Sequence, residues 1–219
     1  MIALIDYGSG NLRSVFNALH AEGAEVEILS QPDQLEQASA VVLPGVGAFG
    51  DCVQQIRSRG FWEPLQEWIA ADRPFLGICV GYQVLFEGSE ESPGESGMGV
   101  FQGQVRKFST PGLKVPQIGW NRLDLTNRQH PLWNGLPADP YVYFVHSFFP
   151  EAAKGTPVIA ECTYGETFAA AASRGRVSGV QFHPEKSQSV GLGILRNFLQ
   201  IGSQVHANPS RPAVALADV

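Results

Sequence analysis

The sequence is poor in cysteine, with only Cys52, Cys79 and Cys162 among its 219 residues. Their number is odd, they lie far apart, and no Cys-x-x-Cys pair is present. A disulfide framework and a structural zinc site both require paired or closely spaced cysteines, so the sequence excludes both. We therefore expect no bound metal, and we expect the protein to reside in the reducing cytoplasm.

Basic residues are also scarce: 15 Lys and Arg stand against 21 Asp and Glu, which gives a formal net charge of −6. Without a basic cluster the protein lacks the electrostatic surface that a phosphate backbone requires, so we exclude nucleic acid as a partner. The sequence contains no apolar run long enough to span a bilayer, and residues 1–6 resemble a strand rather than a signal peptide. We expect a soluble, unprocessed protein with no membrane contact.

The first glycine-rich loop lacks the features of a nucleotide site. Gly8-Ser9-Gly10 follows an apolar run at 2–5, but the third glycine of the dinucleotide fingerprint and the Gly-Lys-Ser/Thr of a P-loop are both missing. We therefore expect no cofactor. The loop still follows the carboxyl end of a strand, which is where open α/β sheets place their functional sites.

The pattern of the chain predicts an α/β fold. With 44% hydrophobic residues, the chain can bury a full core as one domain over 1–202. Strands at 2–5, 26–29, 40–43 and 74–78 alternate with helical patterns at 12–19, 52–58 and 62–71. This alternation predicts a mixed, mostly parallel sheet flanked by helices.

The second half has a different pattern. Residues 87–97 are polar and predict a mobile surface loop. Short strands follow at 100–108, 117–125, 141–149, 158–164, 168–172 and 177–182, and they predict an additional antiparallel strand region with a smaller lobe. A last helix is expected at about 190–201. Residues 203–219 contain two prolines and little apolar periodicity, and they predict a disordered tail.

The run Gly77-Ile78-Cys79-Val80-Gly81 predicts a nucleophile elbow between a strand and a helix. At such a sharp turn the central residue is strained and its side chain stands over the sheet edge, while flanking glycines avoid clashes. The helix N-terminus that follows favours thiolate over thiol, which makes Cys79 a candidate nucleophile. The alternative is a buried cysteine that serves only as a small hydrophobe.

A second glycine-rich loop, at 44–50, follows the third predicted strand. Glycines let a peptide plane turn its N–H toward a bound group, so this loop is a candidate donor to an oxyanion. The alternative is an ordinary turn between strand and helix.

The run Gln181-Phe182-His183-Pro184-Glu185 supplies the partners that a cysteine nucleophile needs. If this run is a strand, Gln181, His183 and Glu185 share one side at a spacing of two. A carboxylate beside an imidazole accepts its N–H, fixes the tautomer and leaves the other nitrogen free for a thiol. The alternative is a solvated surface turn. The elbow at 77–81, however, offers a nucleophile that needs a base, and the run at 181–185 offers a base that needs a nucleophile.

These motifs resemble those of a known family. The elbow and the His-Pro-Glu run are similar to those of the class I, triad-type glutamine amidotransferases. Within them the chain resembles the glutaminase subunits of imidazole glycerol phosphate synthase in histidine biosynthesis, through runs at 6–12, 43–49, 118–121, 144–147 and 183–187. The resemblance covers 1 to about 202. Tyr82 in the elbow departs from the Leu, Met or His that we expect there.

The resemblance implies a glutaminase that uses no cofactor. Cys79 would attack the amide of L-glutamine, His183 would move the proton and Glu185 would hold His183. The other implied roles are an oxyanion hole formed by Val80 with Val46 or Gly47, and substrate contacts from Gln83 and from His146, Ser147 and Phe148.

The resemblance also implies a heterodimer with a (β/α)8-barrel cyclase subunit that receives the ammonia. The cyclase makes imidazole glycerol phosphate and an aminoimidazole carboxamide ribonucleotide. Asn11, Trp120 and Lys186 are the residues that we expect at this interface.

Three alternatives stay open at this point. One is a glutaminase of the same class that serves pyridoxal phosphate or purine synthesis, although Lys186-Ser187 and the 6–11 run argue against it. Another is a catalytically silent binding protein, which would have no reason to keep Cys79, His183 and Glu185 together. A stand-alone cysteine hydrolase is the third, because a glutamine amide and a peptide bond pass through the same intermediate.

Overall fold

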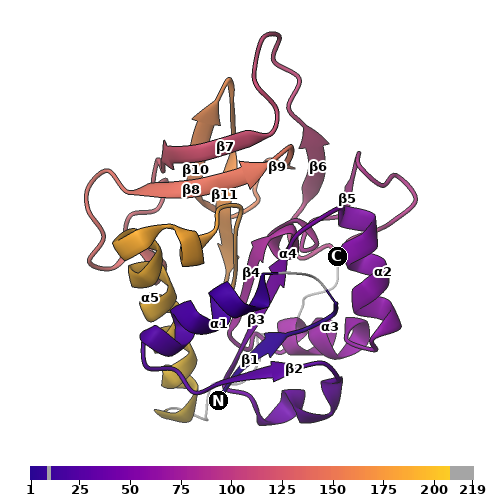
Figure 1. The fold of residues 1–219 in the computed structure, drawn as a ribbon, viewed down its shortest axis with the longest axis vertical. Helices are drawn as coiled ribbons and strands as arrows, with labels where there is room; N and C mark the ends of the chain where they lie inside the picture. Colours follow the sequence, from indigo (N-terminus) through magenta and orange to yellow (C-terminus); the bar gives the residue numbers. More distant parts are fainter. Residues whose placement is uncertain (9–10, 208–219) are drawn as a thin grey trace.

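The computed structural model describes residues 1–8 and 11–207, of which 204–207 are described by their backbone alone. Within these residues the main sheet has seven strands in the order β10-β11-β12-β4-β3-β1-β2 (Figure 1). The strands are β1 (Ile2–Ile5), β2 (Val26–Leu29), β3 (Ala40–Gly45), β4 (Phe75–Cys79), β10 (Val158–Tyr164), β11 (Glu166–Arg174) and β12 (Val177–Val180).

The centre of this sheet is parallel. β2, β1, β3, β4 and β12 run in the same direction, and β11 is antiparallel to both β12 and β10. Every residue of β1, β3, β4 and β12 is buried, which explains their continuous apolar runs, because helices cover a parallel sheet on both faces. The predicted mixed, mostly parallel sheet is confirmed.

Helices cover the two faces of the sheet, with α1 and α5 on one side and α2 and α3 on the other (Figure 1). This arrangement follows from right-handed crossovers, because the chain leaves β1 toward β2 but leaves β3 in the opposite direction, toward β4. The helices are α1 (Leu12–Ala21), α2 (Phe49–Ser58), α3 (Trp62–Ala70), the short α4 (Val80–Gln83) and α5 (Gln188–Ala207). Short 3-10 turns lie at η1 (Pro32–Gln37), η2 (Pro131–Trp133) and η3 (Pro184–Lys186).

Two small sheets stand above the carboxyl ends of the main strands (Figure 1). One contains β5 (Gly88–Ser89), β6 (Gly103–Lys107) and β9 (Phe148–Ala152), and the other contains β7 (Gln117–Arg122) and β8 (Tyr141–His146). The prediction of one strand over 141–149 is wrong. The chain pairs with β7 as far as His146 and with β6 from Phe148, so Ser147 marks a change of partner between two sheets.

The polar stretch 87–97 is fixed to α2, although its composition predicts a mobile loop. The backbone N–H of Phe49 donates to Glu91 at 2.8 Å, and that of Gly50 donates to the Ser92 hydroxyl at 3.0 Å. Both N–H groups belong to the first turn of α2 and have no partner within the helix. The polar residues of the loop therefore serve as caps for this helix.

The last helix is longer than its apolar pattern predicts. α5 runs from Gln188 to Ala207, so residues 203–207, which we expected in a disordered tail, continue the helix. The remainder of the expected tail, 208–219, lies outside the described residues. Within the described part of the chain, no helix is both long and apolar enough to cross a membrane.

Candidate active site

Four chain segments meet at the carboxyl edge of the main sheet. They follow β1, β3, β4 and β12, whose parallel directions bring their carboxyl ends to one side. A cavity of about 300 Å³ opens there. Its lining residues are Val46, Gly47, Cys79, Val80, Gln83, Glu91, Val145, His146, Ser147, Phe148, His183 and Lys186.

Cys79 occupies the strained position of the elbow, with φ 55° and ψ −112°. The glycines around it allow the close packing that this turn requires. A Cβ on Gly77 would lie 2.5 Å from the Gly81 carbonyl oxygen, and one on Gly81 would overlap the Leu43 carbonyl oxygen. The turn therefore tolerates no side chain at either position.

The helix after Cys79 is a single turn, because α4 spans only Val80–Gln83. A single turn has few aligned peptide units, so the macrodipole contributes little to the stability of a thiolate. Any stabilisation of a Cys79 thiolate must come from individual groups near it.

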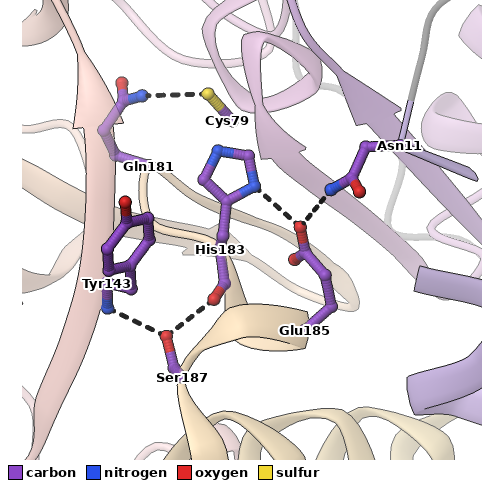
Figure 2. Close-up of polar contacts among 7 residues, drawn as sticks. All are labelled: Asn11, Cys79, Tyr143, Gln181, His183, Glu185 and Ser187. Atoms are coloured by element: carbon purple, nitrogen blue, oxygen red, sulfur yellow. Dashed lines mark hydrogen bonds and ion pairs between the residues drawn. The ribbon is translucent and has the colours of Figure 1, made fainter. Parts of the chain in front are cut away.

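His183 is the first of these groups, and it is held by Glu185. The Nδ1 atom of His183 donates to Oε1 of Glu185 at 2.8 Å, and both side chains are almost completely buried (Figure 2). This leaves Nε2, on the side of the ring that faces Cys79 in Figure 2, without a hydrogen-bond partner among the described residues. Glu185 thus fixes the tautomer that offers Nε2 to the thiol.

The local structure that produces this pair differs from our expectation. β12 ends at Val180, and Pro184–Lys186 form a 3-10 turn, so alternation along a strand does not bring His183 and Glu185 together. The tight turn does so instead, by folding the carboxylate back toward the imidazole.

The pKa of His183 is raised from 6.5 to about 9. Burial lowers this pKa, but the nearby Cys79 sulfur and the hydrogen bond and charge of Glu185 favour the protonated ring and outweigh the effect of burial. The ring beside the Cys79 sulfur is therefore favoured in its protonated form.

Backbone contacts fix the position of His183 against β8. Its N–H donates to the Tyr143 carbonyl at 2.9 Å, and its own carbonyl accepts from the Ser187 hydroxyl at 2.6 Å. The same hydroxyl accepts from the Tyr143 N–H at 2.9 Å, as Figure 2 shows. Ser187, Tyr143 and His183 thus form a closed ring of hydrogen bonds, which fixes the position of the His183 backbone, and with it the imidazole, relative to β8.

The loop after β3 lies directly against the elbow. Gly45 is the register partner of Cys79, and a Cβ on Gly45 would lie 2.5 Å from the Gly81 nitrogen. Gly47 has φ +93°, a conformation that favours glycine. Together with Val80, whose N–H starts α4 and therefore has no helical acceptor, the loop surrounds the space over the sulfur.

The other wall of the cavity is the turn between β8 and β9. The His146 side chain is buried, and its Nδ1 atom forms a hydrogen bond with the Phe148 carbonyl oxygen at 2.8 Å. Burial lowers the pKa of His146 to about 4, so the ring is neutral. Because the Phe148 carbonyl oxygen can only accept, Nδ1 carries the ring's single proton and is the donor. His146 therefore acts as a brace for the 146–148 backbone.

Of the residues expected at the interface, the structure brings two to the site and leaves one apart. Asn11 donates to Oε1 of Glu185 at 2.6 Å, and the exposed Lys186 lines the cavity. Trp120 lies away from the cavity on the outer face of β7, where it is 44% exposed and packs edge-on against Tyr143.

Sequence reasoning missed three residues of the site. Glu91 and Val145 line the cavity, and the Gln181 amide nitrogen lies 3.7 Å from the Cys79 sulfur. No sequence signal places Glu91 there, because its position depends on how the 87–97 loop folds. Gln181 carried a signal, since it is two residues from His183 in the same run.

Comparisons with known proteins agree with this geometry. The model of the family Glutamine amidotransferase class-I matches residues 3–201. Imidazole glycerol phosphate synthase subunit HisH of Microcystis aeruginosa is 50% identical over 202 residues, which cover 91% of this chain and 95% of that relative. The protein of the same name from Acaryochloris marina is 46% identical over 216 residues, which cover 98% of this chain and 99% of the relative.

Solved structures share the fold. A crystal structure of a glutamine amidotransferase superposes with a TM-score of 0.73 at 19% identity, covering 93% of this chain and 100% of the other. The structure of PurLQS from Thermotoga maritima gives a TM-score of 0.70 at 18% identity, covering 94% of this chain and 98% of that one. At these identities the likeness concerns the fold alone.

Proposed function

The chain belongs to the class I glutamine amidotransferase family, and from this premise we propose that Cys79, His183 and Glu185 hydrolyse the side-chain amide of L-glutamine. Because its relatives are HisH subunits, the chain is the glutaminase subunit of an imidazole glycerol phosphate synthase and serves histidine biosynthesis. The observation that carries the residue assignment is the strained Cys79 beside a buried His183–Glu185 pair at the cavity.

In the first half of the reaction, the Cys79 sulfur, whose proton already resides on Nε2 of His183, forms a bond to the amide carbon. The carbonyl π electrons move to oxygen. When the tetrahedral intermediate collapses, the C–N bond breaks and His183 gives the proton to the leaving nitrogen, which departs as ammonia. A thioester of Cys79 remains.

In the second half, water attacks the thioester carbon while His183 takes one of its protons. The C–S bond then breaks, the sulfur leaves as a thiolate, and glutamate is released. Glu185 accepts the Nδ1–H of His183 and holds the imidazole in the orientation that both half-reactions need.

The oxyanion of each tetrahedral intermediate requires donors above Cys79. We assign one to the N–H of Val80, which follows the nucleophile, and the other to Val46 or Gly47, which line the cavity. A preorganised donor of this kind contributes about 3 kcal/mol to the stability of the transition state.

We assign the remaining wall of the cavity to substrate binding. Gln83 contacts the β8–β9 turn and lines the cavity one helical turn beyond Cys79. The braced backbone of His146, Ser147 and Phe148 meets the amino-acid end of glutamine.

The partner of this chain is a cyclase subunit, and we propose that the open side of the cavity faces its (β/α)8 barrel in a cytoplasmic heterodimer. Lys186 lies at the cavity mouth, and the outer face of β7 presents two exposed apolar residues, Ile118 and Trp120. Exposed aromatic residues of this kind are typical anchors of protein interfaces. We also assign Asn11, in the segment that follows β1, to this interface.

The experiment that tests this function measures glutamate release from L-glutamine by the purified protein, alone and with the cognate barrel cyclase and its nucleotide ligand. We expect strong stimulation by the cyclase and no stimulation by the synthase partner of another glutamine amidotransferase. Absence of glutamate release under both conditions, with a folded protein and an active cyclase, would contradict the proposal.

A further inference from the structure

A chain of two buried glutamines links the Cys79 sulfur to the β8–β9 turn. Gln181 is completely buried just beyond β12, and its Nε2 lies 3.7 Å from Sγ of Cys79 (Figure 2). Its Oε1 accepts from Nε2 of Gln83 at 3.0 Å. The same Gln83 nitrogen donates to the Phe148 carbonyl at 2.9 Å.

The order of these contacts fixes which end of each amide faces which neighbour. A backbone carbonyl only accepts hydrogen bonds, so the Gln83 atom beside Phe148 must be its NH₂ group. That NH₂ group only donates, so the Gln181 atom that it meets must be the carbonyl oxygen. The other end of the Gln181 amide is then NH₂, and it is this end that faces the sulfur of Cys79.

We propose that Gln181 is a catalytic residue that donates an N–H···S hydrogen bond to the Cys79 sulfur and stabilises it as an anion. The inference rests on the role proposed above for Cys79. An amide donor has no charge and no proton to lose, so it favours the thiolate at any pH, and a hydrogen bond to an ionised group is stronger than one to its neutral form. The short α4 helix contributes little here, which leaves the stabilisation to single donors.

This hydrogen bond acts in both half-reactions. In the first it increases the fraction of attacking thiolate. In the second the sulfur leaves the tetrahedral intermediate as a thiolate, and the same donor stabilises that leaving group. Gln83 keeps the donor aimed at the sulfur, so one side chain of the substrate cavity also sets the reactivity of the nucleophile.

Several ionisable groups surround the sulfur and must be considered with Gln181. His183 and Glu185 lie on one side, His146, Glu91 and Lys186 line the cavity, and Cys52 lies close enough to interact with Cys79. None of them is altered by an uncharged substitution at Gln181. A change in sulfur reactivity in such a variant therefore reports the lost amide donor.

The test measures the rate of Cys79 alkylation by iodoacetamide as a function of pH, with mass spectrometry of the labelled peptide. Gln181→Met keeps the shape of the side chain without the donor, and Gln181→Glu places a carboxylate near the sulfur. We expect roughly tenfold slower alkylation at neutral pH for Gln181→Met, a profile shifted to higher pH, and a larger effect for Gln181→Glu. The exposed Gln102→Glu is the matched control and should label like the wild type.

A third variant, Gln83→Met, removes the group that orients Gln181 and provides a test if the Gln181 variants do not fold. We expect it to slow alkylation by less than Gln181→Met, and to add nothing in the Gln181→Met background. Unchanged rates and profiles in the folded single variants, or additive effects in the double variant, would overturn the proposal.

These outcomes are separable from a failure of the proposed function. If alkylation of Cys79 in the wild type abolishes glutamate release, Cys79 is the nucleophile whatever the Gln181 variants show. If fully alkylated protein keeps its glutaminase activity, the assignment of the nucleophile fails, and the inference about Gln181 fails with it.

Discussion

Asn11 donates its side-chain amide to Glu185 across 2.6 Å, onto the same carboxylate oxygen that receives Nδ1–H of His183 at 2.8 Å. The two residues are separated by 174 positions in the sequence and come from opposite ends of the chain. Asn11 adopts the left-handed conformation, with φ 73° and ψ 8°, which asparagine tolerates better than most residues. Asn11, in the segment after β1, thereby orients the Glu185 carboxylate, and this carboxylate in turn orients the His183 imidazole.

We predict that Asn11→Asp lowers kcat for glutamine hydrolysis at least about tenfold at neutral pH, because it places a second carboxylate beside Glu185. The substitution keeps the size of the side chain and its tolerance of positive φ. Asn17→Asp, on the exposed side of α1, is the control and should retain wild-type kcat. Steady-state kinetics with saturating cyclase measure both, and equal kcat values for the two variants would argue against the positioning role of Asn11.

The elbow glycines give a stability prediction. Gly81→Ala puts a Cβ into the Leu43 carbonyl oxygen, a backbone atom of the neighbouring strand that cannot move aside. We expect a loss of about 3 kcal/mol or more in the free energy of unfolding, or failure to fold. Gly94→Ala, where a Cβ meets no atom within 4 Å, should leave the free energy of unfolding nearly unchanged. Chemical denaturation distinguishes them, and similar stabilities would contradict the packing that we describe.

The pKa of His183 predicts the alkaline side of the pH profile. Because this pKa is raised from 6.5 to about 9, the ring is protonated at neutral pH and loses its proton as the pH rises through about 9. Ammonia departure needs that proton, so kcat/KM should fall with an apparent midpoint near 9. A rate that instead rises through pH 6.5 and stays level beyond 9 would mean that the resting imidazole is neutral.

Trp120 tests the proposed interface. Its indole is 44% exposed on the outer face of β7, and aromatic anchors of this kind carry about 2 kcal/mol or more of binding energy. We expect Trp120→Ala to weaken cyclase binding roughly thirtyfold, while the alkylation rate of Cys79 stays unchanged. Ile28→Ala, which removes an exposed apolar side chain from β2 at the far edge of the sheet, should bind like the wild type. Titration calorimetry measures both, and equal affinities would remove Trp120 from the interface.

Local patterns in the sequence were enough to predict the parallel half of the fold and the elbow. Buried strands such as β1 and β4 appear as continuous apolar runs, and glycines on both sides of Cys79 are a signal of the sharp turn that the structure contains. These features depend on residues adjacent in the chain, so short-range reasoning captures them.

Features set by long-range contacts were not predictable in the same way. The run 141–149 changes partner at Ser147 from β7 to β6, and no residue in the run signals which strand it will pair with. His183 and Glu185 were paired correctly but for the wrong reason, since a 3-10 turn rather than a strand joins them. The place of Glu91 in the cavity depends on hydrogen bonds to the start of α2.

The central claim is that Cys79 is the nucleophile of a glutaminase, and glutamate release by Cys79→Ser in the presence of saturating cyclase tests it most directly. Cys162→Ser, at a buried cysteine on β10 outside the cavity, is the control. We predict at least about a thousandfold loss for Cys79→Ser and near wild-type release for Cys162→Ser. Turnover of glutamine by a folded Cys79→Ser variant at the wild-type rate would contradict the mechanism.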